Sequence, residues 1–163
     1  KPRSNYVSPK ILIVKTGRKL ACALDPGDRL TLQSLYNLQP KPSCRLRLEY
    51  LLGILNSALL SVYIQQQVTA YKKVFPQINM GHVRGLPIRC IDFDSPEEKK
   101  MHDDLVALVE RMLELNRRSK DAVGREREEL ERKIERTDRK IDELVYKLYG
   151  ITEEEKTVVE GHG

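Results

Sequence analysis

Two stretches of the sequence gather polar and basic side chains of the kinds that read DNA. Residues 16–19 hold a threonine, a glycine, an arginine and a lysine, and residues 65–79 begin with three glutamines and carry two lysines. Arginine and lysine bind phosphates or guanine edges, glutamine and asparagine pair with adenine, and a tyrosine ring can stack on a base. Loops need soluble residues in any case, so composition supports base reading and plain solubility about equally. The candidate DNA-binding residues are Thr16, Arg18, Lys19, Tyr71, Lys72, Lys73, Gln77, Asn79, His82 and Arg84.

The stretch FPQINMGHVRGLPIRC, residues 75–90, surrounds a histidine and an arginine with apolar anchors. His82 has no carboxylate or cysteine near it in sequence, so a surface or helix-capping role is favoured over general acid–base catalysis. We interpret the apolar residues and glycines of the stretch as scaffold. Its front edge, at Gln77 and Asn79, is where DNA is expected, and His82 and Arg84 are candidate phosphate contacts.

The sequence contains no catalytic or metal-binding constellation. Phosphate-cradling glycine loops of the GxxxxGK[ST] and GxGxxG types are absent. Asp92 and Asp94 are interpreted as solvated turn residues ahead of a helix. Cys22, Cys44 and Cys90 have no CxxC or nearby histidine pair, so we expect reduced thiols in a cytosolic protein rather than a zinc site. No catalytic residue, no metal and no bound cofactor are therefore expected in this chain.

Charge is distributed unevenly along the chain. Residues 1–94 hold 14 Lys and Arg against 5 Asp and Glu, a net charge of +9, whereas residues 95–163 hold 15 against 19, a net charge of −4. Basic segments attract phosphates because binding releases condensed counterions, although such an excess is often only a solvated face. No apolar run reaches the roughly 18 residues that span a bilayer, and no signal peptide is recognisable, so we expect no membrane partner.

The first forty residues are expected to form a small sheet. Apolar residues at 11–14 and 20–24 and an alternating run at 29–38 predict three strands, separated by turns at Gly17 and at residues 25–28. Beyond them, apolar residues recur at three- and four-residue steps from Leu48 onward and predict one mostly buried helix of about twenty residues. A short strand, a helical turn capped by Asn79 and a final strand ending near residue 93 are then expected.

From residue 95 onward the pattern is helical. Ser95 and Pro96, followed by Glu98, are typical of a helix start with a capping box. Two seams with alternating three- and four-residue spacing follow, made of Met101, Leu105, Leu108, Met112 and Leu115, and of Leu130, Ile134, Thr137, Ile141, Leu144 and Leu148.

The polar stretch near residues 118–124 either folds these seams into an antiparallel hairpin, which we favour, or continues one long helix with a phase break. Gly150 is expected to end the helix, and Thr152 to cap a last short one. The predicted protein is α+β: a small mixed or antiparallel sheet with a buried helix in residues 1–94, a coiled-coil-like α-helical hairpin in 95–150, and a short capping helix and tail in 151–163.

Three motifs together resemble a known family. They are LLGILNS, INMGHVRGLPI and IDELVYKLYGIT, and their combination is more specific than any one of them. Over roughly residues 10–155 the chain resembles the TaqI-like C-terminal specificity domain, the target-recognition region of restriction–modification DNA adenine methyltransferases. It is similar in plan to one half of a type I restriction specificity subunit.

The resemblance implies a target-recognition module followed by helices that set its spacing and dock it against a catalytic partner. In the family the segment ahead of the INxxxxxxLPI stretch differs with the DNA sequence read, which makes residues 65–77 the specificity candidates here. The family's glycine-rich cofactor loop and NPPY-type tetrapeptide are absent from this sequence. The resemblance therefore implies the non-catalytic C-terminal part of a longer enzyme, with S-adenosylmethionine bound in its catalytic domain.

The expected function is sequence-specific recognition of double-stranded DNA. The expected partner is a methyltransferase or endonuclease catalytic domain, in the same polypeptide or in a complex, in the cytoplasm of a prokaryote. The alternative is a protein-interaction module that uses the helical hairpin. RNA binding is less favoured, because nine aromatic residues are spread over the chain and no aromatic-rich sheet face is expected.

Overall fold

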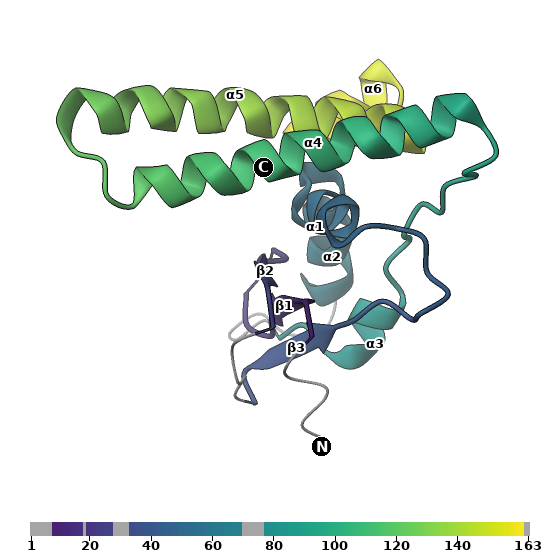
Figure 1. Cartoon of the computed structure of the whole chain (residues 1–163). Helices are drawn as coiled ribbons and strands as arrows, with labels where there is room; N and C mark the ends of the chain where they lie inside the picture. The colour runs from purple at the N-terminus through teal and green to yellow at the C-terminus, as the bar shows by residue number, and fades with distance from the viewer. Residues whose placement is uncertain (1–7, 18, 28–32, 70–76, 162–163) are drawn as a thin grey trace.

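The protein is an α+β structure in which a long helical hairpin lies across one end of a small sheet-and-helix unit (Figure 1). It is a computed structural model that describes residues 8–17, 19–27, 33–69 and 77–161. Within these residues the predicted fold class is confirmed, with three strands and six helices.

The sheet is antiparallel, with strand β1 (Lys10–Val14) between β2 (Cys22–Asp25) and β3 (Leu35–Leu38). The register pairs Ile11 with Leu24 on one side and with Leu38 on the other. The predicted strands at 11–14 and 20–24 are found with shifts of one or two residues. Of the run predicted at 29–38, Leu35–Leu38 is a strand and residues 33–34 form a turn, while residues 28–32 lie outside the described residues.

The outer edge of β2 is covered by a side chain from the first helix. Val14 N donates to Ala21 O, and the alternation of an antiparallel ladder therefore turns the backbone groups of Cys22 away from β1. Asn56 meets both of them: its Oδ1 accepts from Cys22 N at 2.9 Å and its Nδ2 donates to Cys22 O at 3.0 Å. The Asn56 side chain thus makes the two hydrogen bonds that a further strand would make to Cys22, and it joins α1 to the sheet.

The single buried helix predicted from Leu48 onward is wrong, because the chain forms two helices with a 60° bend between them. They are α1 (Leu48–Asn56) and α2 (Ala58–Thr69). Ser57 between them has an extended backbone, and its Oγ donates to Ile54 O at 2.7 Å. The first N–H of α2 is then capped from another helix, since Ala58 N donates to Asp142 Oδ1 at 2.8 Å. The spacing of three and four residues continues across the bend from Leu52 to Leu55 and Leu59, so the sequence period does not reveal it.

The predicted final strand that ends near residue 93 is also absent. The helical turn before it is present as α3 (Met80–Arg84), but residues 85–93 form no strand. Tyrosine hydroxyls, rather than a neighbouring strand, bond the carbonyls of Gly85, Pro87 and Arg89. These partners are distant in sequence, so local propensity cannot indicate them.

Helices α4 (Pro96–Ser119) and α5 (Gly124–Tyr149) form the antiparallel hairpin, which rules out the alternative of one long helix. Ser95 caps α4 as predicted, but Glu98 bonds Asp92 N at 2.8 Å instead of closing a capping box. Gly150 ends α5 with a left-handed backbone, φ 66°, which glycine adopts at little cost. Helix α6 (Glu153–Glu160) begins with a capping box between Thr152 and Glu155.

The start of α1 is docked on the hairpin through a buried histidine. Arg47, the N-cap residue of α1, donates its backbone N–H to His102 Nε2 at 3.4 Å. The His102 ring lies between Tyr50 and Phe93, with ring centroids 4.8 and 5.1 Å away. The Arg47–His102 hydrogen bond and the contact between the Tyr50 and His102 rings therefore dock the start of α1 on α4.

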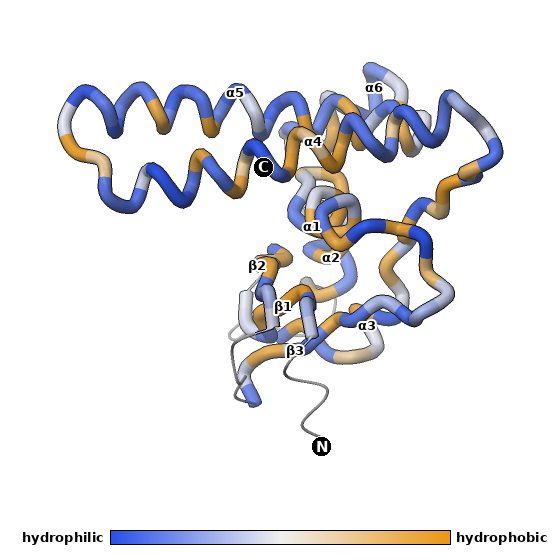
Figure 2. The backbone as a smooth tube through the Cα atoms, in the orientation of Figure 1, coloured by the Kyte–Doolittle hydropathy of each residue, from blue (hydrophilic) through white to orange (hydrophobic). Residues whose placement is uncertain are grey.

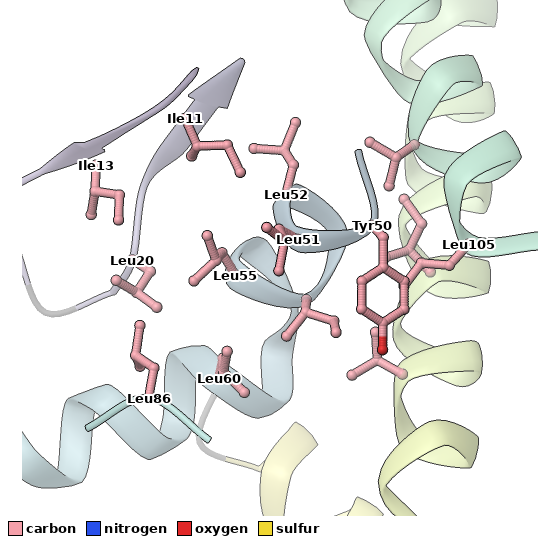
Figure 3. Close-up of a cluster of buried hydrophobic side chains, with 14 of the residues drawn as sticks. Ile11, Ile13, Leu20, Tyr50, Leu51, Leu52, Leu55, Leu60, Leu86 and Leu105 are labelled. Atoms are coloured by element: carbon pink, nitrogen blue, oxygen red, sulfur yellow. The ribbon is translucent and has the colours of Figure 1, made fainter. Parts of the chain in front are cut away.

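The sheet, α1, α2 and the hairpin share one hydrophobic core. Figure 3 shows Tyr50 of α1 facing Leu105 of α4, with Ile11 and Ile13 of β1 on the other side of the cluster. The predicted parts 1–94 and 95–150 are therefore joined by buried apolar contacts.

The end of the hairpin that carries the turn projects beyond the rest of the protein (Figure 1), and most residues along it are hydrophilic (Figure 2). Among the described residues no single helix is long and apolar enough to cross a membrane, and only the bent pair α1 and α2 would pass together on length and composition.

Candidate nucleic-acid interface

The two stretches predicted to contact DNA meet at one pair of residues. Thr16, in the turn after β1, forms an isolated antiparallel bridge with Gln77, just ahead of α3. Ile78 N donates to Lys15 O at 2.8 Å, and the Ile78 side chain is 1% exposed. Thr16 and Gln77 are both exposed beside this buried anchor. The bridge therefore places two of the predicted residues next to each other on the surface.

Asn79 and His82 are held in a capping box at the start of α3. Asn79 Oδ1 accepts from His82 N at 3.0 Å, and His82 Nδ1 accepts from Asn79 N at 3.2 Å. An Nδ1 that accepts a hydrogen bond carries no proton. The capping function interpreted for His82 is thus found, and Asn79 Nδ2 lies 3.4 Å from His82 Nε2.

Lys19 and Arg84 are exposed and make no ion pair with a carboxylate of the described residues. Lys19 lines a cavity of about 250 Å³ together with Asp138 and Asp142. Burial raises the pKa of Asp142 to about 6 despite its hydrogen bond from Ala58 N. The remaining predicted residues, Arg18, Tyr71, Lys72 and Lys73, lie outside the described residues.

Two further exposed cations ahead of α1 were not among the residues predicted from the sequence. Lys41 and Arg45 lie in the connection between β3 and α1, both exposed, and neither pairs with a described carboxylate. The Arg45 guanidinium lies 4.5 Å from the centroid of the Phe93 ring. Arg47, by contrast, is engaged by Glu49 and Glu110. The run PKPSCRLR was the sequence signal that would have found these two.

Three tyrosine hydroxyls hold the segment that follows α3. Tyr63 donates to Gly85 O at 3.1 Å, Tyr149 to Pro87 O at 2.6 Å, and Tyr50 to Arg89 O at 2.9 Å. Arg89 N in turn donates to the Tyr149 hydroxyl at 3.1 Å.

Burial raises the pKa of Tyr50 and of Tyr149, which keeps both hydroxyls protonated as donors. Helices α1, α2 and α5 therefore jointly anchor the chain next to α3.

The sequence profile of the TaqI-like C-terminal specificity domain matches residues 1–88, more than half of the chain. The chain belongs to the TaqI-like C-terminal specificity domain family. No curated protein matches the chain in sequence.

The TaqI-like specificity domain includes the sheet, α1, α2, α3 and the first anchored carbonyls, and it ends at Ile88. The resemblance to this family is therefore confirmed over residues 1–88, and its extension through the hairpin to residue 155 stays a prediction. The matched residues hold 13 Lys and Arg against 3 Asp and Glu, so the positive charge lies in the domain itself.

The described side chains of the TaqI-like specificity domain and its hairpin offer no group of three His, Cys, Asp or Glu that could hold a metal ion. Burial raises the pKa of the Cys22 thiol to about 12, so this thiol stays protonated and poorly nucleophilic. The side chains of the Thr16–Gln77 bridge offer a hydroxyl and an amide, which suit hydrogen bonding to bases and phosphates.

Proposed function

We propose that this chain is a sequence-specific double-stranded DNA recognition module of a restriction–modification methyltransferase or endonuclease, and that it is non-catalytic by itself. The family match over residues 1–88 is the observation that carries the proposal. The Thr16–Gln77 bridge supports it, because it joins the two loops whose residue types suit base reading.

The charge distribution gives the module a physical means of holding DNA. Lys19, Lys41, Arg45 and Arg84 make no ion pair with the described carboxylates, which leaves all four as candidates for phosphate contacts. Phosphate contacts set the register of a duplex, and each bidentate base contact adds about 1–3 kcal/mol of discrimination. Residues 65–77 are the proposed source of those base contacts.

The proposed partner is a catalytic domain that binds S-adenosylmethionine, in the same polypeptide or in a complex, in a prokaryotic cytoplasm. Methylating adenine requires the base to leave the duplex, which costs a few kcal/mol. Binding across the neighbouring base pairs offsets that cost and chooses the site. The recognition module and the catalytic domain then have separate tasks.

Selection from a library of random DNA duplexes tests the proposal. The 163-residue chain should enrich one duplex sequence, and its affinity for that duplex should fall by about 0.9 log units per log unit of salt for each phosphate contact. Failure to enrich any sequence, or affinity that does not respond to salt, would contradict the proposal.

A matched pair of double variants locates the surface. Lys19→Gln with Arg84→Gln should weaken binding to the enriched duplex and lower the salt slope by about 2. Lys120→Gln with Arg125→Gln removes the same charge from the exposed end of the hairpin and should change neither quantity beyond a weak long-range effect. Equal losses in the two variants would place the surface elsewhere.

Protein binding through the hairpin is a second candidate function. Its outer face has a groove of about 720 Å³ in which Ala107, Leu108 and Leu144 are flanked by Arg111, Lys140 and Lys147. If this groove is the functional part, Ala107→Glu should abolish self-association or partner binding and leave DNA selection intact. The two predicted apolar seams are less suited to a partner, since Leu105, Leu115, Leu130, Ile141 and Leu148 are buried within the protein.

A further inference from the structure

Alternate carbonyls of one irregular segment are each bonded by a tyrosine hydroxyl from a different helix. The segment is residues 85–89, and the donors are Tyr63 of α2, Tyr149 of α5 and Tyr50 of α1. A spacing of two residues is that of carbonyls along an extended chain. The side chains thus take the place that a neighbouring strand has in a sheet.

The segment begins where α3 ends. Gly85 is the C-cap of α3, and its N–H bonds back to Gly81 O. The other end of α3 is fixed by Asn79 and, one step earlier, by the Thr16–Gln77 bridge. Helix α3 and the amides in front of it are therefore tied at both ends, by the sheet on one side and by the tyrosines on the other.

Tyr149 has the largest part in this anchoring. Its hydroxyl donates to Pro87 O at 2.6 Å and accepts from Arg89 N at 3.1 Å, so it fixes two backbone groups at once. It also lies at the end of α5, outside the residues that match the TaqI-like specificity domain. Through Tyr149 the hairpin therefore contacts the backbone of the segment that follows α3.

We propose that Tyr149 is a positioning residue for DNA recognition: its hydroxyl sets the placement of residues 85–89 and, through α3, of Gln77 and Asn79. The inference rests on the proposed function. Base-edge hydrogen bonds depend on donor and acceptor placement to a fraction of an ångström, so a loosened segment loses discrimination before it loses phosphate binding. The hairpin then contributes to specificity without touching a base.

Tyr146 provides a matched control one helical turn earlier. It is on the same helix and buried, and its hydroxyl makes no hydrogen bond to the described residues. Tyr146→Phe and Tyr149→Phe both remove one oxygen from α5 and leave the ring in place. Only Tyr149→Phe removes contacts to residues 85–89.

The test measures two affinities for each variant. One is for the duplex that the wild-type chain enriches, and the other is for a duplex of the same composition with a scrambled sequence. In Tyr149→Phe the ratio of the two affinities should fall about five- to tenfold, which corresponds to the loss of one or two hydrogen bonds. The slope of log affinity against log salt should not change. In Tyr146→Phe the ratio should equal that of the wild type. A merely structural hydroxyl would lower both affinities by the same factor, which leaves the ratio unchanged and would overturn the inference.

The hydrogen-exchange rate of the Arg89 amide, measured without DNA, tests the anchoring by Tyr149 independently of the proposed function. This amide should exchange faster in Tyr149→Phe than in the wild type and in Tyr146→Phe, and equal rates would overturn the anchoring itself. If the wild-type chain enriches no duplex, the proposed function fails and the recognition part of the inference falls with it. Enrichment with an unchanged affinity ratio in Tyr149→Phe overturns the inference alone.

Discussion

Gln77 pairs with Thr16 in an antiparallel bridge that joins the segment before α3 to the turn after β1. Ile78 N reinforces the pair by donating to Lys15 O at 2.8 Å. Two loops that are distant in sequence therefore present their polar side chains from one surface.

A cross-linking experiment checks this pairing. Directly opposed residues of an antiparallel pair have Cα atoms about 4.5–5.5 Å apart, within the range of a disulfide. Thr16→Cys with Gln77→Cys, in a chain whose Cys44 and Cys90 are replaced by serine, should form an intramolecular disulfide on mild oxidation, detected by mass spectrometry. Thr16→Cys alone in the same background should not, and a double variant that stays reduced would contradict the bridge.

The Asn56 side chain is expected to stabilise the protein by joining α1 to the edge of β2. Asn56→Ala removes both bonds to Cys22 and exposes its backbone groups, so the free energy of unfolding should fall by about 1–2 kcal/mol. Among the described residues the Asn116 side chain bonds only to Met112 O of its own helix, and Asn116→Ala should change stability by less than about 0.5 kcal/mol. Urea unfolding measures both variants, and equal effects would refute the bridging role.

Gly53 marks the closest approach of α1 to the hairpin. A Cβ at this position would lie 2.8 Å from Val109 Cγ2 and 3.1 Å from Leu105 Cδ1. We expect Gly53→Ala to destabilise the protein by about 1–3 kcal/mol through overpacking, although alanine has the higher helix propensity.

Gly85→Ala is the control for this contact, because its Cβ would meet nothing closer than 3.4 Å. Thermal unfolding should show little change for it, and a Gly53→Ala variant as stable as the wild type would show that the two helices are not tightly packed.

Asp142 is expected to make stability depend on pH. Burial raises its pKa to about 6, above the value of an aspartate in an unfolded chain, so the folded state binds more protons between about pH 4 and 6. The contribution of Asp142 to the free energy of unfolding is fully present below about pH 4 and is lost as the pH rises through 6. Asp142→Asn removes the charge and keeps an oxygen for Ala58 N.

Asp142→Asn should therefore exceed the wild type in stability by about 1–2 kcal/mol at pH 7, after solvent screening, with the difference vanishing near pH 4. Denaturant unfolding across this range measures the difference. Asp121→Asn changes an exposed residue of the hairpin turn, and its stability should depend on pH in the same way as that of the wild type. A pH-independent gap between Asp142→Asn and the wild type would exclude the titration of Asp142 as its cause.

Local sequence patterns predicted where helices begin and end, but they failed where residues distant in sequence determine the backbone conformation. The cap at Ser95, the stop at Gly150 and the capping box at Thr152 follow from residues adjacent in sequence. The bend at Ser57 is completed by Asp142, and the strand predicted near residue 93 is displaced by tyrosines of other helices. Neither partner is visible in a local pattern.

The candidate site was predictable in its residue types and not in its geometry. Side-chain chemistry pointed to Thr16, Gln77 and Asn79, but only the fold shows that Thr16 meets Gln77 and that Asn79 is occupied in capping α3. Lys41 and Arg45 were missed although the basic run PKPSCRLR marks them, because the sequence does not show that the connection between β3 and α1 leaves both side chains exposed.

The salt dependence of binding to the enriched duplex tests the central claim most directly. Arg18→Gln, Lys72→Gln and Lys73→Gln together should lower the wild-type slope of log affinity against log salt by up to about 2.7. The control triple variant Lys120→Gln, Arg125→Gln and Arg132→Gln changes the charge of the hairpin equally and should keep the wild-type slope. Equal slopes for the wild type and the first triple variant would contradict DNA recognition by these loops.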